Sequence, residues 1–481
     1  MRLSNRCLIK RDFDAWAYNI YWPQKKAFLP LMGFASLTVE DIKFAYNAWC
    51  LLRLAMFYGA THPKVLSPLV NCTPSMDIIH GGNRIFYMHS QVSTPLSQRK
   101  IKVALTPCHP GAQLLQSFPW ETAAQQGGWG STEGDDNCGV EIILGMENGM
   151  SEEVRAGCDY CLYVPQYGSV GSLSMLSAMA IAVHLAFCAR WMRRGTEVNE
   201  RLVPFLGHMP LSSDANGTIA PCTLPHEKNL IHFSNEEIRA LLAERRQQYR
   251  MQLSVMVYNE FGDRNIGAIM RNANVFNCEE LIVLNRRKFN RRGAVGTHHV
   301  LTTTFHATLH DRSCQSRLQG YVLWLLHQYY PYLKVYGASP SPSNDNDIDV
   351  ATFLRHDNIH LQRWLRCNGY QHNEAGPIAN ITASFGTGDH WVHLIGKEVY
   401  LDDESSLVSA VKSAAAAGYR GIMLVVPEEG ATLPSELVKE SQRVVFIAHP
   451  NRLARDVQRG LNGALATAVA LERLRTAIDN I

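Results

Sequence analysis

The stretch Asn265-Ile-Gly-Ala-Ile-Met-Arg-Asn-Ala-Asn-Val-Phe276 has an earlier, altered counterpart in Asn47-Ala-Trp-Cys-Leu-Leu-Arg-Leu-Ala-Met-Phe-Tyr-Gly59. Both stretches keep an asparagine, then an arginine six residues later, then an alanine two residues after that. Further blocks follow each stretch in the same order. We therefore interpret the chain as a tandem duplication of one domain.

Two shorter blocks complete each copy. In the first copy they are Leu144-Gly-Met-Glu-Asn-Gly-Met-Ser151 and Val164-Pro-Gln-Tyr-Gly-Ser-Val-Gly-Ser-Leu-Ser174. In the second they are Val426-Pro-Glu-Glu-Gly-Ala-Thr-Leu-Pro434 and Gly460-Leu-Asn462. One such block alone would be weak evidence for a relation between the copies, but three blocks that occur twice in the same order are specific evidence.

Composition is that of an ordinary folded protein of two or three domains. The 481 residues are 46% hydrophobic and 19% charged, and no uninterrupted apolar run reaches the roughly 18 residues that a membrane helix needs. We therefore predict no membrane contact. The net charge is only +3, so a nucleic-acid site must come from a local cluster of charges.

Cysteines and the first residues bear on location. The 12 cysteines form no disulfide-like framework, and the close pair Cys158 and Cys161 lacks the second pair of ligands that a zinc site needs. We predict no metal, and reduced thiols inside the cell. The basic residues before Asp12 are typical of a mitochondrial targeting segment, but also of an ordinary basic tail. We expect a mitochondrial location, and a cytoplasmic one otherwise.

The hydrophobic pattern predicts the fold class α/β. Apolar runs of strand length alternate with apolar helical stretches, such as 41–58 and 172–190. This alternation is typical of a parallel sheet covered by helices on both faces. Strands are expected at residues 102–105, 140–144, 161–164, 253–258, 281–284, 333–336, 422–426 and 443–448.

Four segments are expected along the chain. They are an N-terminal extension at 1–35, a first domain at 36–195, a linker with an Arg-rich helix at 196–250, and a second domain at 251–481 with an insertion near 337–389. The linker helix should begin at Ser234, because Ser234-Asn-Glu-Glu237 matches a capping box. Its arginines are expected to form a solvated face rather than an RNA contact.

The blocks resemble the motifs of the SpoU–TrmH branch of the SPOUT RNA methyltransferases. That family's first motif is approximately Asn-x-Gly-x-Ile-x-Arg-x-Ala-x-x-Phe-Gly, which residues 265–277 match at every defined position but the last. Its second motif is Gly-x-Glu before a Gly-Leu-Ser/Pro turn. Its third is Ile-Pro, a glycine, then Ser-Leu-Asn, whose spacing residues 164–173 reproduce.

The resemblance implies both a fold and an activity. The fold would be two tandem SPOUT-type parallel-sheet domains with C-terminal trefoil knots, packed as a pseudo-dimer within one chain. That chain could act as a monomer. The activity would be methyl transfer from S-adenosylmethionine to a ribose 2′-hydroxyl of RNA, with rRNA favoured over tRNA.

Site residues follow from the same resemblance. The third block should form a strand end, a tight turn and a helix start, which leaves backbone groups free for an adenosine. By carry-over, the cofactor-binding residues would be Gly145, Val164, Pro165, Gly168 and Leu173. Plain core packing is the alternative for Val164 and Leu173.

Three residues would serve the reaction. Arg271 would hold the ribose-phosphate and stabilise the oxygen as its proton leaves, since arginine is too weak an acid to act as an ordinary base. Asn265 would orient Arg271 or the ribose. Glu147 would hold the motif loops together.

The two copies depart from the motifs in different places. Trp49 replaces the first-motif glycine and Ser174 the third-motif asparagine in the first copy, whose second block is also one residue short. In the second copy Pro427 replaces the second-motif glycine, and the third block is altered. We hypothesise one composite site per chain, in which the first copy binds cofactor and the second lends Asn265 and Arg271.

A basic run follows the first motif of the second copy. Five cations lie within seven residues, which makes this the densest local footprint for RNA, although a solvated loop is the alternative. Phe289 between them could stack on an unpaired base. The RNA-binding residues would be Arg286, Arg287, Lys288, Arg291 and Arg292.

Two classes of function compete. The leading hypothesis is an RNA ribose 2′-O-methyltransferase. The second is a catalytically inactive RNA-binding factor that kept the fold and acts in ribosome assembly, with assembly proteins as partners, or as a structural component. A dinucleotide or nucleotide-hydrolysing enzyme is disfavoured, because neither a Gly-x-Gly-x-x-Gly turn after a strand nor a phosphate-binding P-loop is present.

Overall fold

The computed structural model describes residues 31, 33–40, 42, 45–60, 63–65, 86–87, 100–106, 109, 111–130, 138–146, 149–191, 230, 233–260, 265–327, 333–335, 381–383, 397–428, 434–447 and 461–481. These residues contain two seven-stranded sheets and one two-stranded sheet. Every strand pairing within the two large sheets is parallel. The predicted α/β class with two parallel-sheet units is confirmed.

The first unit carries the order β3-β2-β1-β6-β4-β7-β5. Its central strand β6 (Val140–Leu144) is buried throughout and apolar except for Glu141, because helices cover both faces of a parallel sheet. The other strands are β1 (Ala35–Val39), β2 (Lys64–Val65), β3 (Phe86–Tyr87), β4 (Ile101–Leu105), β5 (Gln113–Leu114) and β7 (Tyr160–Tyr163). The helices are α3 (Ala45–Tyr58), η5 (Leu115–Ser117), α5 (Trp120–Gln126), α6 (Glu152–Ala156) and α7 (Met175–Trp191).

The second unit carries the order β10-β9-β8-β15-β11-β16-β14. Its strands are β8 (Gln252–Asn259), β9 (Glu280–Asn285), β10 (Thr302–His306), β11 (Tyr321–His327), β14 (Glu398–Tyr400), β15 (Gly421–Val426) and β16 (Arg443–Phe446). The helices are α8 (Asn235–Arg246), α9 (Asn265–Val275), η7 (Arg292–Ala294), η8 (Thr297–His299), α10 (Arg312–Leu318), α13 (Glu404–Ala416), α14 (Ser435–Glu440) and α16 (Gly463–Asp479).

Both large sheets have the same connectivity. When the seven strands of each large sheet are numbered in chain order, leaving out β12 and β13, both sheets have the order 3-2-1-6-4-7-5. The first-motif helix follows the first strand in each unit, as α3 and as α9, and the last helix follows the third motif, as α7 and as α16. The two halves of the chain therefore share one topology.

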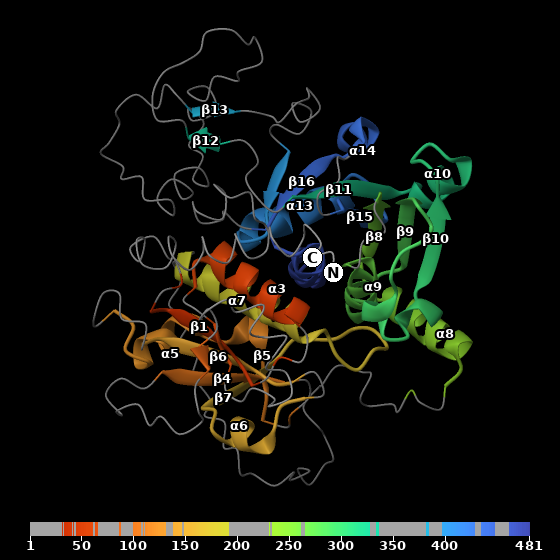
Figure 1. Ribbon diagram of the computed structural model, residues 1–481. Coiled ribbons are helices and arrows are strands. Elements are labelled where there is room, and N and C mark those ends of the chain that lie inside the picture. Colours follow the sequence, from red (N-terminus) through yellow and green to blue (C-terminus); the bar gives the residue numbers. More distant parts are fainter. Residues whose placement is uncertain are drawn as a thin grey trace, which may run out of the picture.

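The two units meet through their last helices. Helix α16 packs on α7 and also on α9. Both α7 and α16 are buried on nearly all sides, as expected for helices enclosed in a core. In Figure 1 the first unit (red to yellow) and the second (green to blue) lie side by side, with α3, α7 and α9 between the two sheets. A single hydrophobic cluster includes residues of both units.

Polar contacts also join the units. Arg475 of α16 is fully buried, donates to the carbonyl oxygen of Phe276, and lies 4.0 Å from the ring centroid of Tyr249 and 5.7 Å from that of Tyr167. The hydroxyl of Tyr167 in the first unit donates to Asp479 of α16 at 3.0 Å. These contacts require α16 and the loop at Tyr167 to stay together.

Several predicted elements need correction. The strand expected at 333–336 is β12 (Leu333–Val335), which pairs antiparallel with β13 (Ile381–Ala383) outside both large sheets. The fourth strand of the second unit is instead β11, an apolar run that the pattern did not assign. The strands β1, β2, β3, β5, β10 and β14 were also not predicted.

The linker helix begins where predicted. Ser234 caps α8 with the expected box, in which its side chain accepts from Glu237 and the Glu237 side chain accepts from Ser234. Its arginines do not form a purely solvated face, because Arg245 is buried and Arg246 donates to Asn277 at 2.8 Å. Helix α8 is therefore part of the second unit's surface rather than a free linker.

Several predictions lie outside the described residues. They concern residues 1–30, Glu147, Glu429, Gly460, and all of the insertion near 337–389 except β13. The predicted trefoil knots also stay a prediction. Within the described part of the chain, no helix is long and apolar enough to cross a membrane.

Candidate functional site

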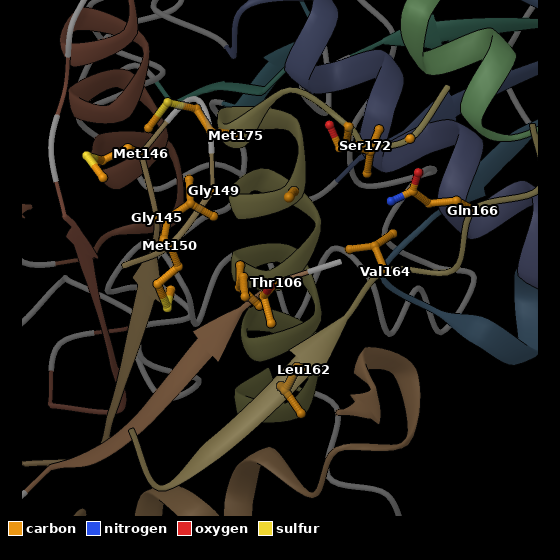
Figure 2. A pocket seen from close by; sticks show the side chains of 15 residues that line it. Thr106, Gly145, Met146, Gly149, Met150, Leu162, Val164, Gln166, Ser172 and Met175 are labelled. Carbon is orange, nitrogen blue, oxygen red and sulfur yellow. The ribbon is translucent and has the colours of Figure 1, made fainter. Parts of the chain in front are cut away.

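A pocket of about 410 Å³ opens at the carboxyl ends of three neighbouring strands of the first unit, β6, β4 and β7. Ligands of open α/β sheets bind at this edge, and the volume is within the range of small-molecule sites. Helix α7 closes one side (Figure 2). The lining residues are Leu105, Thr106, Leu144, Gly145, Met146, Gly149, Met150, Leu162, Val164, Gln166, Gly171, Ser172, Leu173, Met175 and Ala178.

One wall is the turn that follows β6. A Cβ atom at Gly145 would lie 2.5 Å from the backbone nitrogen of Met150, so only glycine lets this turn close. A bridge between Met146 and Gly149, whose φ is +114°, completes the turn. The backbone N–H of Ser151 then donates to the carboxylate of Glu40 at 2.9 Å, which fixes the turn to the end of β1.

The opposite wall is the segment that continues β7. Leu162, Val164 and Gln166 all line the pocket, and their spacing of two residues places them on one face of an extended chain. In Figure 2, Val164, Gln166 and Ser172 lie across the pocket from Gly145, Gly149 and Met146. The walls are mainly apolar, with few polar side chains among them.

Gln166 is the unusual member of this lining. The residue is 4% exposed, and its Oε1 atom has no hydrogen-bond partner among the described residues. A buried amide oxygen without a partner costs about 1–3 kcal/mol. A ligand that donates a hydrogen bond in this pocket would remove that cost.

The second unit holds the pocket loop through Arg271 of α9. Its Nε donates to the carbonyl oxygen of Ser172 at 2.8 Å, and its Nη2 donates to the Ser172 hydroxyl at 2.9 Å and to the Leu173 carbonyl at 3.1 Å. Burial lowers the pKa of Arg271, but a guanidinium remains cationic at neutral pH. Among the described residues, Nη1 has no hydrogen-bond partner, so two of the five N–H donors of Arg271 stay available.

The end of α9 holds the preceding part of the same loop. The side-chain oxygen of Asn274 accepts from the backbone N–H groups of Ser169 and Val170 at 3.1 and 3.0 Å. The carbonyl oxygen of Val275 accepts from the N–H groups of Tyr167 and Gly168. Gly168 therefore lies in a close contact between the units, and the contact requires that this residue has no side chain.

The first-motif asparagines point to the last helix of their own unit. Asn265 accepts a hydrogen bond from Asn462 at 2.6 Å, and Asn462 caps the start of α16. In the first unit the side chain of Asn47 contacts the sulfur of Met175 at 3.7 Å, at the start of α7. Met175 lines the pocket, so Asn47 approaches it whereas Asn265 binds within the second unit.

The basic run lies directly against α9. A Cβ at Gly267 would come within 2.8 Å of the Asn290 carbonyl oxygen, and one at Gly293 within 2.6 Å of the Ala268 nitrogen. The first-motif glycine thus lets the loop approach the helix. Gly267 and Arg271 are four residues apart, which places them on the same face of α9 about one turn from each other. The basic loop and the pocket loop are therefore neighbours on one helix face.

All five cations of the basic run are exposed. Phe289 is half-buried. The centroid of its ring lies 6.3 Å from the ring centroid of Phe305 and 5.9 Å from the guanidinium carbon of Arg291. The ring thus already has protein partners on its faces or edges. Burial, followed by nearby His299 and Arg291, lowers the pKa of His298, which leaves it neutral at pH 7.

The structure separates the predicted site residues into groups. Gly145, Val164 and Leu173 line the pocket, whereas Pro165 and Gly168 do not. Arg271 reaches the pocket loop, and Asn265 does not. The motifs gave no indication of Thr106, which follows β4, or of a polar role for Gln166.

No family model matches the sequence, and no curated protein matches it. Solved structures similar to this chain include SpoU and TrmH methyltransferases. The motif resemblance named above is to the same group of proteins.

Three of these structures cover about half of this chain. A probable methyltransferase from Bordetella pertussis is 14% identical over 48% of this chain and 97% of its own, with a TM-score of 0.26. The SpoU methyltransferase AviRb from Streptomyces viridochromogenes, solved with the cofactor AdoMet, is 14% identical over 48% of this chain and 62% of its own, with a TM-score of 0.26. The TrmH/SpoU tRNA modifying enzyme of A. aeolicus is 12% identical over 51% and 85%, with a TM-score of 0.27.

Proposed function

We propose that this protein is an S-adenosylmethionine-dependent RNA ribose 2′-O-methyltransferase with one composite site per chain. The site is the pocket of the first unit together with Arg271 of the second. The observation that carries the proposal is the hydrogen bonding of Arg271 to Ser172 and Leu173, two residues that line the pocket. In this proposal the two units act as a pseudo-dimer produced by tandem duplication.

The pocket suits the proposed cofactor. Its apolar side chains match the faces of a purine ring, and the buried amide of Gln166 offers a partner to a polar ring edge. When bound, S-adenosylmethionine would supply the methyl group. The chain's own residues would hold the cofactor between the turn at Gly145 and the segment from Val164 to Leu173, which also keeps bulk water away from the reacting atoms.

Arg271 would act on the RNA through its remaining donors. Its Nε and Nη2 atoms hold the pocket loop, while Nη1, which has no partner among the described residues, would hydrogen-bond a ribose oxygen or phosphate. A fixed cation at this place stabilises the negative charge that develops as the 2′-hydroxyl loses its proton. Asn47, rather than Asn265, is the first-motif asparagine next to the pocket, through its contact with Met175. We therefore propose Asn47 as the residue that orients the ribose.

Calorimetric titration with S-adenosylmethionine tests the proposal. We expect one binding site per chain. Ala178 of α7 lines the pocket, so Ala178→Leu should weaken binding at least about tenfold by filling it. Ala189, a half-buried alanine of the same helix outside the lining, is the matched control, and Ala189→Leu should leave the affinity unchanged. No binding by the folded wild-type protein would contradict the proposal.

The second candidate is an RNA-binding factor without catalysis. The replacement of third-motif asparagine by Ser174 and of second-motif glycine by Pro427 favours it. The two candidates differ in one property, since only the enzyme transfers a methyl group from the bound cofactor. The leading proposal includes rRNA as the substrate and ribosome-assembly proteins as partners. It also includes a mitochondrial location, which the basic first residues support.

The basic loop should provide the electrostatic part of RNA binding. We expect Arg287→Ala with Lys288→Ala to weaken binding of a single-stranded RNA oligonucleotide and to reduce the salt dependence, log K against log salt, by about 1.4 for two lost phosphate contacts. Both side chains are exposed, so folding should be unaffected.

The exposed lysines of α13 and α14 provide a control with the same change of charge. Lys412→Ala with Lys439→Ala should leave the salt dependence unchanged, because both lie on other elements. Equal effects of the two double variants would show that the basic loop is an ordinary solvated face.

A further inference from the structure

We infer that Gln166 recognises the exocyclic amine of the cofactor's adenine and thereby determines which purine the pocket accepts. This inference rests on the proposed function, because it assigns a role within the same pocket. It concerns a residue that the motifs do not require to be polar.

The position of Gln166 is fixed from both sides. It continues the face on which Leu162 and Val164 line the pocket, and the next residue, Tyr167, donates its backbone N–H to Val275 of the second unit at 2.7 Å. The residue is 4% exposed, so its side chain has little freedom to turn toward solvent. Its amide is held at the pocket wall (Figure 2).

The chemistry of the amide is specific. A glutamine side chain has an acceptor oxygen beside a donor nitrogen, and Oε1 of Gln166 lacks a partner among the described residues. Adenine has the complementary pattern, an N–H donor on its exocyclic amine beside an acceptor ring nitrogen. This pairing of glutamine with adenine is a known bidentate contact in base recognition. The apolar neighbours Leu162 and Val164 would contact the flat face of the same ring.

If the N–H donor to Gln166 came from a group other than adenine, substitution of Gln166 would have different effects on binding. If the donor belonged to the RNA, substitution of Gln166 would change RNA binding and leave cofactor binding intact. If a buried water satisfied the amide, substitution would affect neither ligand. The adenine assignment alone predicts a coupling between Gln166 and the exocyclic amine of the cofactor.

A double-variant cycle measures that coupling. The two ligands are S-adenosylhomocysteine and its 6-deamino analogue, in which purine replaces adenine. The two proteins are the wild type and Gln166→Met, which replaces the amide by an apolar side chain of similar length. Calorimetry gives the four affinities, so the readout does not depend on activity.

The wild type should bind S-adenosylhomocysteine about tenfold more tightly than the deamino analogue, as expected for one buried hydrogen bond. Gln166→Met should bind the two ligands within about twofold of each other. Gln166→Leu repeats the test if the methionine variant is unstable. The exposed Gln125 of α5 provides the control, and Gln125→Met should keep the wild-type preference.

Two results would overturn the inference in different ways. Binding by wild type with a preference that Gln166→Met and Gln166→Leu leave intact would show that another group recognises the amine, while the proposed function stands. Failure of the wild type to bind S-adenosylhomocysteine at all would overturn the proposed function together with this assignment.

Discussion

Replacing Gly168 by alanine is expected to lower the free energy of unfolding by about 3 kcal/mol, a large effect for one methyl group. The added Cβ would lie 1.6 Å from the carbonyl oxygen of Asn274 and 2.5 Å from its carbonyl carbon. These are backbone atoms of a buried helix end, which cannot move aside as a flexible side chain can. The loop cannot retreat either, because the N–H groups of Tyr167 and Gly168 both donate to Val275.

Gly171 of the same loop is a closely matched control. A Cβ there would meet nothing within 4 Å, so Gly171→Ala should change the free energy of unfolding by well under about 1 kcal/mol. Urea denaturation followed by circular dichroism measures both variants. Equal stabilities would mean that the loop can shift away from α9, and the close contact between the units would not be required for folding.

The two glycines also show what sequence motifs can and cannot reveal. The third block correctly placed a strand end, a turn and a helix start at the pocket, because such patterns are local. The reason for Gly168 is not local, since the atom that excludes a side chain belongs to Asn274 in the other half of the chain. The motif spacing therefore identifies Gly168 as a required glycine. It assigns this glycine to the cofactor, whereas the group next to it is the backbone of Asn274.

Helix geometry explains the different positions of Asn265 and Arg271. Six residues of an α-helix turn the chain through about 600°, so the two side chains point in directions about 120° apart. Arg271 can then reach the first unit while Asn265 binds Asn462. The angle between the two side chains can be calculated from the sequence. Their hydrogen-bond partners cannot, because these lie in distant parts of the chain.

The strands show a similar limit. β8 and β15 were predicted because their runs are apolar, except for Ser254 in β8, and have the length of a strand. β11 has an equally apolar run, Tyr321–His327, but such a run fits a buried helix as well as a strand. Its identity is set by pairing with β15 and β16, which come later in the chain. The strands β2, β3 and β5 are too short for any periodicity.

Replacing Arg271 by alanine is expected to reduce methyl transfer to the natural RNA by at least about 100-fold, the usual loss when a preorganised charge is removed from a developing anion. The same variant should also bind S-adenosylmethionine about tenfold more weakly, because Ser172 and Leu173 lose three hydrogen bonds that hold the pocket wall. Arg312 of α10 is exposed, and Figure 1 shows α10 on the side of the second unit away from the first, so Arg312→Ala should change neither property.

Kinetics at saturating S-adenosylmethionine separate the two roles of Arg271. If it only supports the loop, high cofactor concentration will restore the wild-type kcat of Arg271→Ala. If Nη1 also acts on the ribose, kcat stays low after the cofactor site is filled. Arg271→Lys sharpens the comparison, because lysine keeps the positive charge but cannot reproduce the planar set of donors. We expect Arg271→Lys to recover part of kcat and little of the cofactor affinity; full recovery of the rate of Arg271→Ala by cofactor alone would exclude Arg271 from the chemical step.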